Sequence, residues 1–199
     1  TAIREALGLI RAGGGNAAVH RCRPPFASQS AAHDPEKKMD LPAHQLSMTV
    51  LMTPDTANFA GNVHGGTILK LLDQAAYACA ARYSGCYVVT LSVDQVMFRE
   101  PIMVGELVTF LASVNYTGTS SMEIGIKVMA ENIRTQVVRH VNSCFFTMVA
   151  VDEARKPVAV PPLRPFSPDE RRRHAAAQVR KQLRQEMAAR AEAARTQSA

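Results

Sequence analysis

One segment of the sequence, residues 65–83, restricts the possible fold more than any other. It begins with Gly65 and Gly66, and after the first turn nearly all of its side chains are apolar. This pattern predicts a helix that is buried on most sides. Ser84 and Gly85 follow and are typical of a helix end. The rest of the chain must therefore supply a layer that surrounds this helix.

The segments around the helix predict an antiparallel sheet. Alternating apolar side chains and a high content of β-branched residues predict strands at residues 47–52, 87–98, 106–116, 121–131 and 136–151. Short turns with Gly, Pro or Asn separate the last four. One strand, one long helix and four strands in succession predict an α+β fold, with a curved antiparallel sheet wrapped around one central helix.

The two ends of the chain differ from this unit. Residues 1–40 contain a Gly-Gly-Gly run and a Pro-Pro pair without sustained periodicity, so we expect a disordered N-terminal extension. The α+β domain is expected over 41–166. Residues 167–199 open with Ser-Pro-Asp-Glu and continue with many Ala and Arg residues, which predicts a basic C-terminal helix as an extension of the fold.

Charge and composition exclude several classes of function. The net charge is +6, but the expected domain balances nine Lys and Arg against nine Asp and Glu, so we expect no nucleic-acid partner. No apolar run approaches the roughly 20 residues of a membrane span, and we expect no membrane insertion. Neither a Cys-x-x-Cys pair nor a tight Cys/His cluster occurs, so no metal site is expected. The start of the chain lacks the pattern of a secretory signal, and the expected location is cytoplasmic.

Asp73 is the first candidate for chemistry. A carboxylate in the middle of an apolar helix is costly to bury alone, so it must face solvent, a partner group or a cavity. It follows Gly66 by seven residues, close to two turns, and therefore lies on the same helix face as the helix start. A substrate along this face would meet both points.

The helix entrance supplies the other candidates. The first turn of a helix has free N–H groups, and Gly65 and Gly66 leave them open to a carbonyl oxygen that becomes an oxyanion. Asn62 and His64 are placed to orient a water or the substrate. Alternative roles remain open: close packing for the glycines, a cap or buried structural group for His64, and a turn for Asn62. With Asp73 as general base or as nucleophile, these residues supply what the hydrolysis of an activated acyl carbonyl needs.

Four motifs in order resemble a known family. They are Asn-Val-His-Gly-Gly at 62–66, Asp73 in the helix, the strand-like segment 89–98, and Gly-Thr-Ser-Ser-Met-Glu at 118–123. Their order and spacing resemble the hotdog-fold acyl-CoA thioesterases. The resemblance is strongest to the cytosolic acyl-CoA hydrolase subgroup, which includes the brain-type enzyme and single-domain bacterial relatives. It extends over about residues 45–163.

The resemblance implies hydrolysis of fatty acyl-CoA to free fatty acid and coenzyme A, with no cofactor because coenzyme A belongs to the substrate. It also implies a homodimer, assembled as a trimer of dimers, with sites that combine Asn62 of one chain with Asp73 of the other. The residues expected to contact the coenzyme A moiety are Gly118, Thr119, Ser120 and Ser121, with Arg99 and Arg139 as candidates for its phosphates.

Two alternatives remain on the same fold. One is a non-catalytic acyl-CoA-binding sensor, which would need neither Asp73 nor Asn62. The other is an acyl-thioester hydratase or dehydratase, which would need a His and acid pair that only His64 offers.

Overall fold

The computed structural model describes residues 41–197. The expected N-terminal extension, residues 1–40, lies outside the described residues. The chain divides into two compact units between Pro162 and Leu163.

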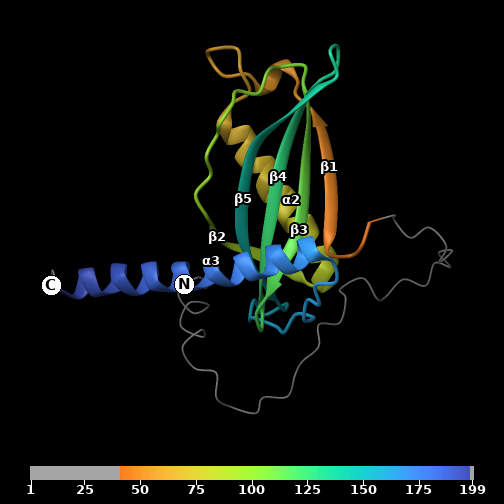
Figure 1. The fold of residues 1–199 in the computed structure, drawn as a ribbon. Coiled ribbons are helices and arrows are strands. Elements are labelled where there is room, and N and C mark those ends of the chain that lie inside the picture. The colour runs from red at the N-terminus through yellow and green to blue at the C-terminus, as the bar shows by residue number, and fades with distance from the viewer. Residues whose placement is uncertain (1–40, 198–199) are drawn as a thin grey trace. The chain divides into compact units, whose positions relative to one another are not determined.

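The first unit is a five-stranded antiparallel sheet curled around one helix (Figure 1). The strands lie in the spatial order β1-β3-β4-β5-β2, so β1 and β2 form the two edges. The elements are β1 (Gln45–Leu51), the short 3-10 helix η1 (Pro54–Thr56), α2 (Gly65–Ser84), β2 (Tyr87–Val93), β3 (Leu107–Thr117), β4 (Ser121–Asn132) and β5 (Val137–Val151). The predicted α+β architecture with one central helix is confirmed.

One face of α2 forms the core with the sheet. The helix contacts all five strands, and its buried side chains recur every three or four residues. They are Ile68, Leu72, Ala75, Ala76, Cys79 and Ala80. The opposite face is different, because Leu69, Asp73 and Tyr77 are exposed. Within one chain the helix is therefore buried on one face, and not on most sides as predicted.

The expected stop signal ends α2. Gly85 has a φ of 68°, in the left-handed region, and its N–H donates to the carbonyl of Ala81 at 2.9 Å. A side chain at this φ would be strained, which explains why glycine stands here.

Strand β2 is shorter than the predicted strand 87–98. It ends at Val93, after a register shift between Thr90 and Ser92, and the chain then leaves the sheet. The apolar residues beyond it serve another purpose. The ring of Phe98 lies 3.7 Å from the position that a Cβ on Gly65 would take, so it covers the start of α2. The position of Phe98 beside the helix start accounts for one apolar residue of this pattern, whereas Met97 is exposed.

The second unit contains α3 (Pro168–Gln197). Its start is the predicted capping box: the Glu170 N–H donates to Ser167 Oγ at 3.2 Å, and the Ser167 N–H donates to Glu170 Oε2 at 3.1 Å. Among residues 41–197, no helix combines the length and the hydropathy that a membrane span requires.

Candidate active site

The start of α2 is held by backbone hydrogen bonds from two segments. The Val63 N–H donates to the carbonyl of Ile102 at 2.8 Å, and the His64 N–H donates to the carbonyl of Thr56 at 2.8 Å. These bonds fix the direction in which the chain enters the helix. The free N–H groups of the first turn therefore have a defined position.

His64 caps the helix and engages one of the two expected donors. Its Nδ1 accepts a hydrogen bond from the Gly66 N–H at 2.9 Å. An accepting Nδ1 carries no proton, so a neutral ring carries its proton on Nε2. The Gly65 N–H has no partner among residues 41–197. In this state Gly65, and not Gly66, offers the open donor at the helix entrance.

Asp73 is oriented by a residue that the sequence analysis did not select. The hydroxyl of Thr90, on β2, donates to Asp73 Oδ1 at 2.6 Å. A hydroxyl bond to a carboxylate of this length is charge-assisted and strong. The carboxylate lies on the exposed face of α2, beside the edge strand of the sheet. It is therefore both accessible and held in place.

Asp73 and the helix entrance do not meet within one chain. Eight residues separate Gly65 from Asp73, which corresponds to about 12 Å along the helix axis. Oxyanion donors act at roughly 3 Å from the oxygen that they stabilise. One acyl carbonyl cannot touch both groups of the same chain, so the predicted set is incomplete in a single subunit.

The entrance loop contains a second asparagine, Asn58, that the sequence analysis missed. Its Oδ1 accepts from the N–H groups of Ala60 at 2.8 Å and Asn62 at 3.2 Å. Its own N–H donates to the carbonyl of Asn62 at 2.6 Å. Asn58 and Asn62 thus belong to one tight turn just before His64.

The residues that we expect to contact coenzyme A lie in two separate parts of the chain. The turn 118–121 lies beyond β3, whose 11 residues extend on the order of 35 Å from the end of the sheet that carries the helix entrance. Arg99 lies near the entrance, next to Phe98, and is exposed. One chain does not bring this turn and the entrance together.

Arg139 is a poor candidate for a phosphate ligand. Its guanidinium binds the carboxylates of Glu100 and Glu106, so its charge is already neutralised within the fold. This pairing could not be predicted from the sequence, because 33 residues separate Arg139 from Glu106.

The thiols of Cys79 and Cys144 are buried and are not suited to nucleophilic chemistry. Burial raises the pKa of Cys79 and of Cys144 to about 12, which keeps both protonated near neutral pH. Across the described residues, no group of three or more His, Cys, Asp or Glu side chains is arranged to hold a metal ion.

Comparison with known proteins places this geometry in a family. Residues 60–137 match the model of the thioesterase superfamily. Protein VdlD of Helicobacter pylori is 51% identical over 140 residues, which are 70% of this chain and 80% of the relative. A hexameric acyl-CoA thioesterase of known structure is 34% identical, with a TM-score of 0.72 over 74% of this chain and 94% of that one. The chain belongs to the thioesterase superfamily. Its sheet and helix have the hotdog fold of that superfamily.

Two further relatives of this thioesterase bear on its subgroup and site. The cytosolic acyl coenzyme A thioester hydrolase of Rattus norvegicus is 32% identical over 130 residues, which are 61% of this chain but only 34% of that protein. An acyl-CoA hydrolase from Staphylococcus aureus, solved with butyryl coenzyme A and coenzyme A, is 28% identical. Its TM-score is 0.68, over 77% of this chain and 93% of that one.

Alanine variants of the Staphylococcus aureus hydrolase have also been solved. They replace an aspartate, an asparagine 15 positions before it, and a threonine 17 positions after it. In the present chain, Asn58 lies 15 positions before Asp73, and Thr90 lies 17 positions after it. The same residue types recur at the same spacings. The spacing corresponds to Asn58 and not to Asn62.

Proposed function

We propose that this thioesterase hydrolyses acyl-CoA thioesters to a free fatty acid and coenzyme A, in the cytoplasm. The observation that carries the proposal is Asp73, an exposed helix carboxylate oriented by the hydroxyl of Thr90. The relatives named acyl-CoA hydrolases and thioesterases support the substrate class. The cytosolic relative supports the location.

Asp73 activates the attacking group. As a general base it takes a proton from water, whose oxygen attacks the thioester carbonyl carbon. Gly65 N–H stabilises the oxyanion, and Gly66 N–H joins it if the His64 ring is displaced. The tetrahedral intermediate collapses, the C–S bond breaks and the coenzyme A sulfur is protonated. Alternatively, Asp73 attacks the carbonyl carbon directly, the C–S bond breaks and coenzyme A leaves as the thiolate, and water then hydrolyses the resulting mixed anhydride.

An asparagine of the entrance loop positions the water or the carbonyl. Asn62 fits this role by its position next to the helix start, and its backbone bridges to Met103. Asn58 fits it by the spacing to Asp73. Both amides lie in one turn, so we assign the role to Asn58 and retain Asn62 as the alternative.

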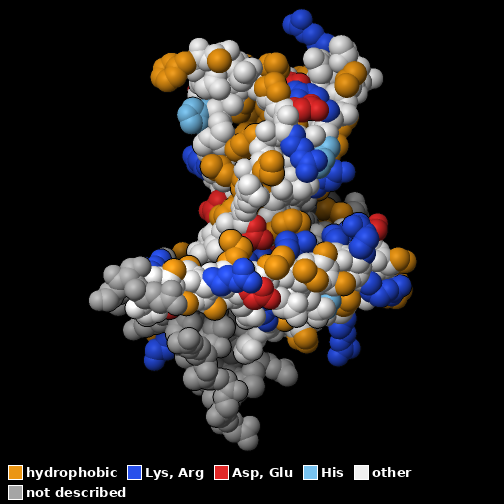
Figure 2. All heavy atoms as spheres, turned by 60° about the vertical axis from the view of Figure 1, so that its left-hand side comes forward, with side chains coloured by type: hydrophobic (Ala, Val, Ile, Leu, Met, Phe, Trp, Pro, Cys, Tyr) orange, Lys and Arg blue, Asp and Glu red, His pale blue; other side chains and the backbone are white. Residues whose placement is uncertain are grey.

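Two chains are needed to complete the site. The edge strand β2 has no strand partner on its outer side within the described sheet, and such an edge is a template for pairing. Exposed apolar side chains of β2 and α2 flank Asp73, and they include Leu69, Tyr77, Tyr87 and Val89. Figure 2 shows hydrophobic groups at the surface of the face that it presents. We assign the face formed by β2 and α2 to a second copy of the chain, which brings its helix entrance to Asp73.

The remaining expected contacts also depend on assembly. Because turn 118–121 lies far from the entrance of its own chain, it would contact coenzyme A at a site formed with another subunit. Arg99 would face a phosphate from the entrance side. Two of the similar thioesterases are hexameric, which supports a trimer of dimers here.

The test is release of free coenzyme A thiol from short, medium and long acyl-CoAs by the wild type and by Asp73→Asn. The substitution keeps the shape of the side chain and removes its charge. We expect turnover that falls at least about 100-fold in the variant, because a missing base or nucleophile removes the chemical step. Equal rates would refute the role of Asp73. Binding of coenzyme A ligands without turnover in the wild type would establish the sensor alternative instead.

A further inference from the structure

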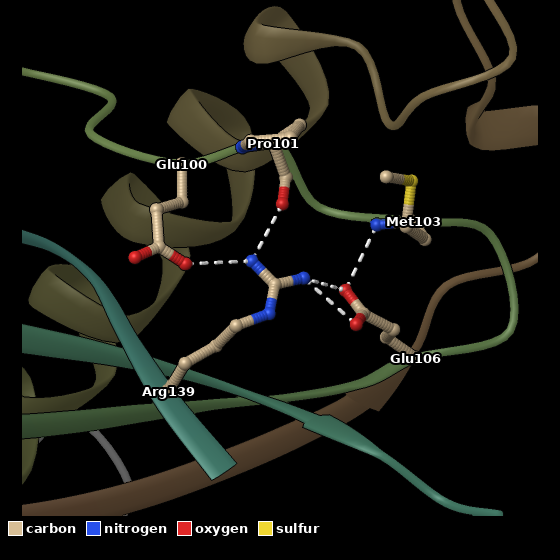
Figure 3. Close-up of polar contacts among 5 residues, drawn as sticks. All are labelled: Glu100, Pro101, Met103, Glu106 and Arg139. Atoms are coloured by element: carbon tan, nitrogen blue, oxygen red, sulfur yellow. Dashed lines mark hydrogen bonds and ion pairs between the residues drawn. The ribbon is translucent and has the colours of Figure 1, made fainter. Parts of the chain in front are cut away.

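Arg139, on β5, ties the loop before β3 to the sheet (Figure 3). Its Nη1 donates to the carbonyl of Pro101 at 2.7 Å and to Glu100 Oε2 at 3.2 Å. Its Nη2 donates to both carboxylate oxygens of Glu106, at 2.7 and 2.5 Å. One guanidinium thus contacts three positions of the segment 100–106.

Glu106 is the buried half of this pair. The residue is 5% exposed, and its Oε2 also accepts from the Met103 N–H at 2.8 Å. A carboxylate this buried needs a charged partner, and Arg139 supplies it. The hydrogen bond to Glu106 raises the pKa of the Arg139 guanidinium above its usual value, so the arginine stays protonated.

The segment held by this pair is the one on which the helix entrance rests. The carbonyl of Ile102 accepts from the Val63 N–H, and Met103 bridges to Asn62. The chain of contacts therefore runs from Arg139 through Glu106 and Met103 to the residues just before His64. No residue of the ion pair needs to touch the substrate to influence the site.

We propose that Arg139 and Glu106 are positioning residues that hold the entrance of α2 in its catalytic orientation. Without the pair, the segment 100–106 keeps the bond from the Arg99 N–H to the carbonyl of Val141 on β5 but loses its side-chain anchor there, and the bond from Val63 to Ile102 is held less firmly. The open Gly65 N–H and the asparagine amide then lose their alignment with the thioester. The expected loss of catalytic rate rests on the proposed function, whereas the expected loosening of the bond from Val63 to Ile102 does not.

Glu100 provides a matched control. It binds the same guanidinium, but its side chain is 50% exposed and the bond is longer, at 3.2 Å. No described contact links its carboxylate to Ile102 or Met103. Glu100→Gln and Glu106→Gln are the same chemical change on two partners of one arginine, and only the second should disturb the entrance.

The first readout is hydrogen–deuterium exchange of the peptide that contains Val63. In Glu106→Gln we expect the Val63 amide to exchange about tenfold faster or more, because its acceptor moves more freely. In Glu100→Gln we expect a change of less than about twofold. Amides in the middle of β4 serve as an internal reference for global unfolding. This readout needs no substrate and stands even if the wild type proves inactive.

The second readout is steady-state hydrolysis, well below the melting temperature of each variant. Misplacement near 1 Å can cost about 100-fold in rate, so we expect kcat of Glu106→Gln to fall about 10- to 100-fold with KM nearly unchanged. Glu100→Gln should stay within about twofold of wild type. A wild type without turnover would refute the proposed function and leave the exchange result to decide on this inference.

Arg139→Lys guards against a variant that does not fold. Lysine keeps the charge but cannot contact Pro101 and both oxygens of Glu106 at once. We expect the same direction of change in Val63 exchange and in kcat. Two results would overturn the inference. One is a Val63 amide that exchanges at the wild-type rate in folded Glu106→Gln or in Arg139→Lys. The other is an equal effect of Glu106→Gln and Glu100→Gln.

Discussion

At the residue scale, the hydroxyl of Thr90 is the group that fixes Asp73. The bond of 2.6 Å orients one carboxylate oxygen and leaves the other for water or substrate. Thr90→Ala should lower kcat about tenfold, because the carboxylate gains freedom at the moment of attack. Thr90→Ser keeps the hydroxyl and should stay within about threefold of wild type. Equal losses in both variants would show that the methyl group, not the hydroxyl, matters.

The two asparagines of the entrance loop can be separated by isosteric changes. Asn58→Asp keeps the Oδ1 acceptor that binds Ala60 and Asn62, so it preserves the turn, removes the amide donor and adds a negative charge, as Asn62→Asp also does. If Asn58 donates to water or to the carbonyl, Asn58→Asp should lose at least about tenfold in kcat, and Asn62→Asp should lose much less. The reverse order would assign the role to Asn62. Circular dichroism and thermal melts check that both variants fold.

Asn142 is a buried amide whose removal should stabilise the fold. It is fully buried on β5, and neither its Nδ2 nor its Oδ1 has a partner among the described residues. An unpaired buried polar group costs about 1–3 kcal/mol, so Asn142→Leu should raise the free energy of unfolding by a similar amount. Asn115→Leu is the control, because Asn115 is also buried but accepts a hydrogen bond from Ser113. A lower melting temperature for Asn142→Leu would contradict this expectation.

At the element scale, α2 was predictable because its signals are local. The apolar run after Gly65 and Gly66 marks its extent and Gly85 marks its end, but its burial on one face only was not predicted. Strand β2 was predicted too long because Val96, Met97 and Phe98 carry a strand-like pattern. They lie in the segment after β2, where Met97 and Phe98 are exposed and only the ring of Phe98 lies close to Gly65. Alternating apolar residues alone therefore did not distinguish a paired strand from an exposed loop segment.

The left-handed residue at the end of α2 gives a prediction for stability alone. Gly85→Ala places a Cβ at a φ of 68°, which costs about 1–2 kcal/mol. For a chain of this size that corresponds to a melting temperature lower by about 2–8 °C. Asparagine tolerates this conformation better, so Gly85→Asn should lose clearly less. Equal melting temperatures for the two variants would contradict the role of backbone strain.

At the scale of the whole molecule, the missing parts of the sequence interpretation share one cause. The bond between Thr90 and Asp73 and the pair of Arg139 and Glu106 depend on which segments the fold brings together. The sequence showed the residue types, including the carboxylate and the glycines, but not these partners. The separation of Asp73 from the entrance, in contrast, follows from residue spacing and helix geometry.

That separation predicts complementation between two inactive variants. In the proposed dimer, each site combines the entrance of one chain with Asp73 of the other. Asp73→Asn still carries Asn58, and Asn58→Asp still carries Asp73, so a mixed dimer restores one intact site of two. With random pairing of co-expressed chains, half of the dimers are mixed, and activity should return to about a quarter of wild type.

As a control, the two variants are purified separately and combined under conditions in which their subunits do not exchange. This mixture should remain inactive. Val89→Lys tests the dimer face itself. A charge on the exposed edge strand should weaken the dimer, which light scattering would show as a lower mass, and it should remove the recovery of activity. Val137→Lys, at a more exposed position on β5, should leave the size unchanged. Recovery absent from well-folded mixed dimers would mean that the site lies within one chain. The 12 Å between Asp73 and the entrance would then have to close by movement of the helix start.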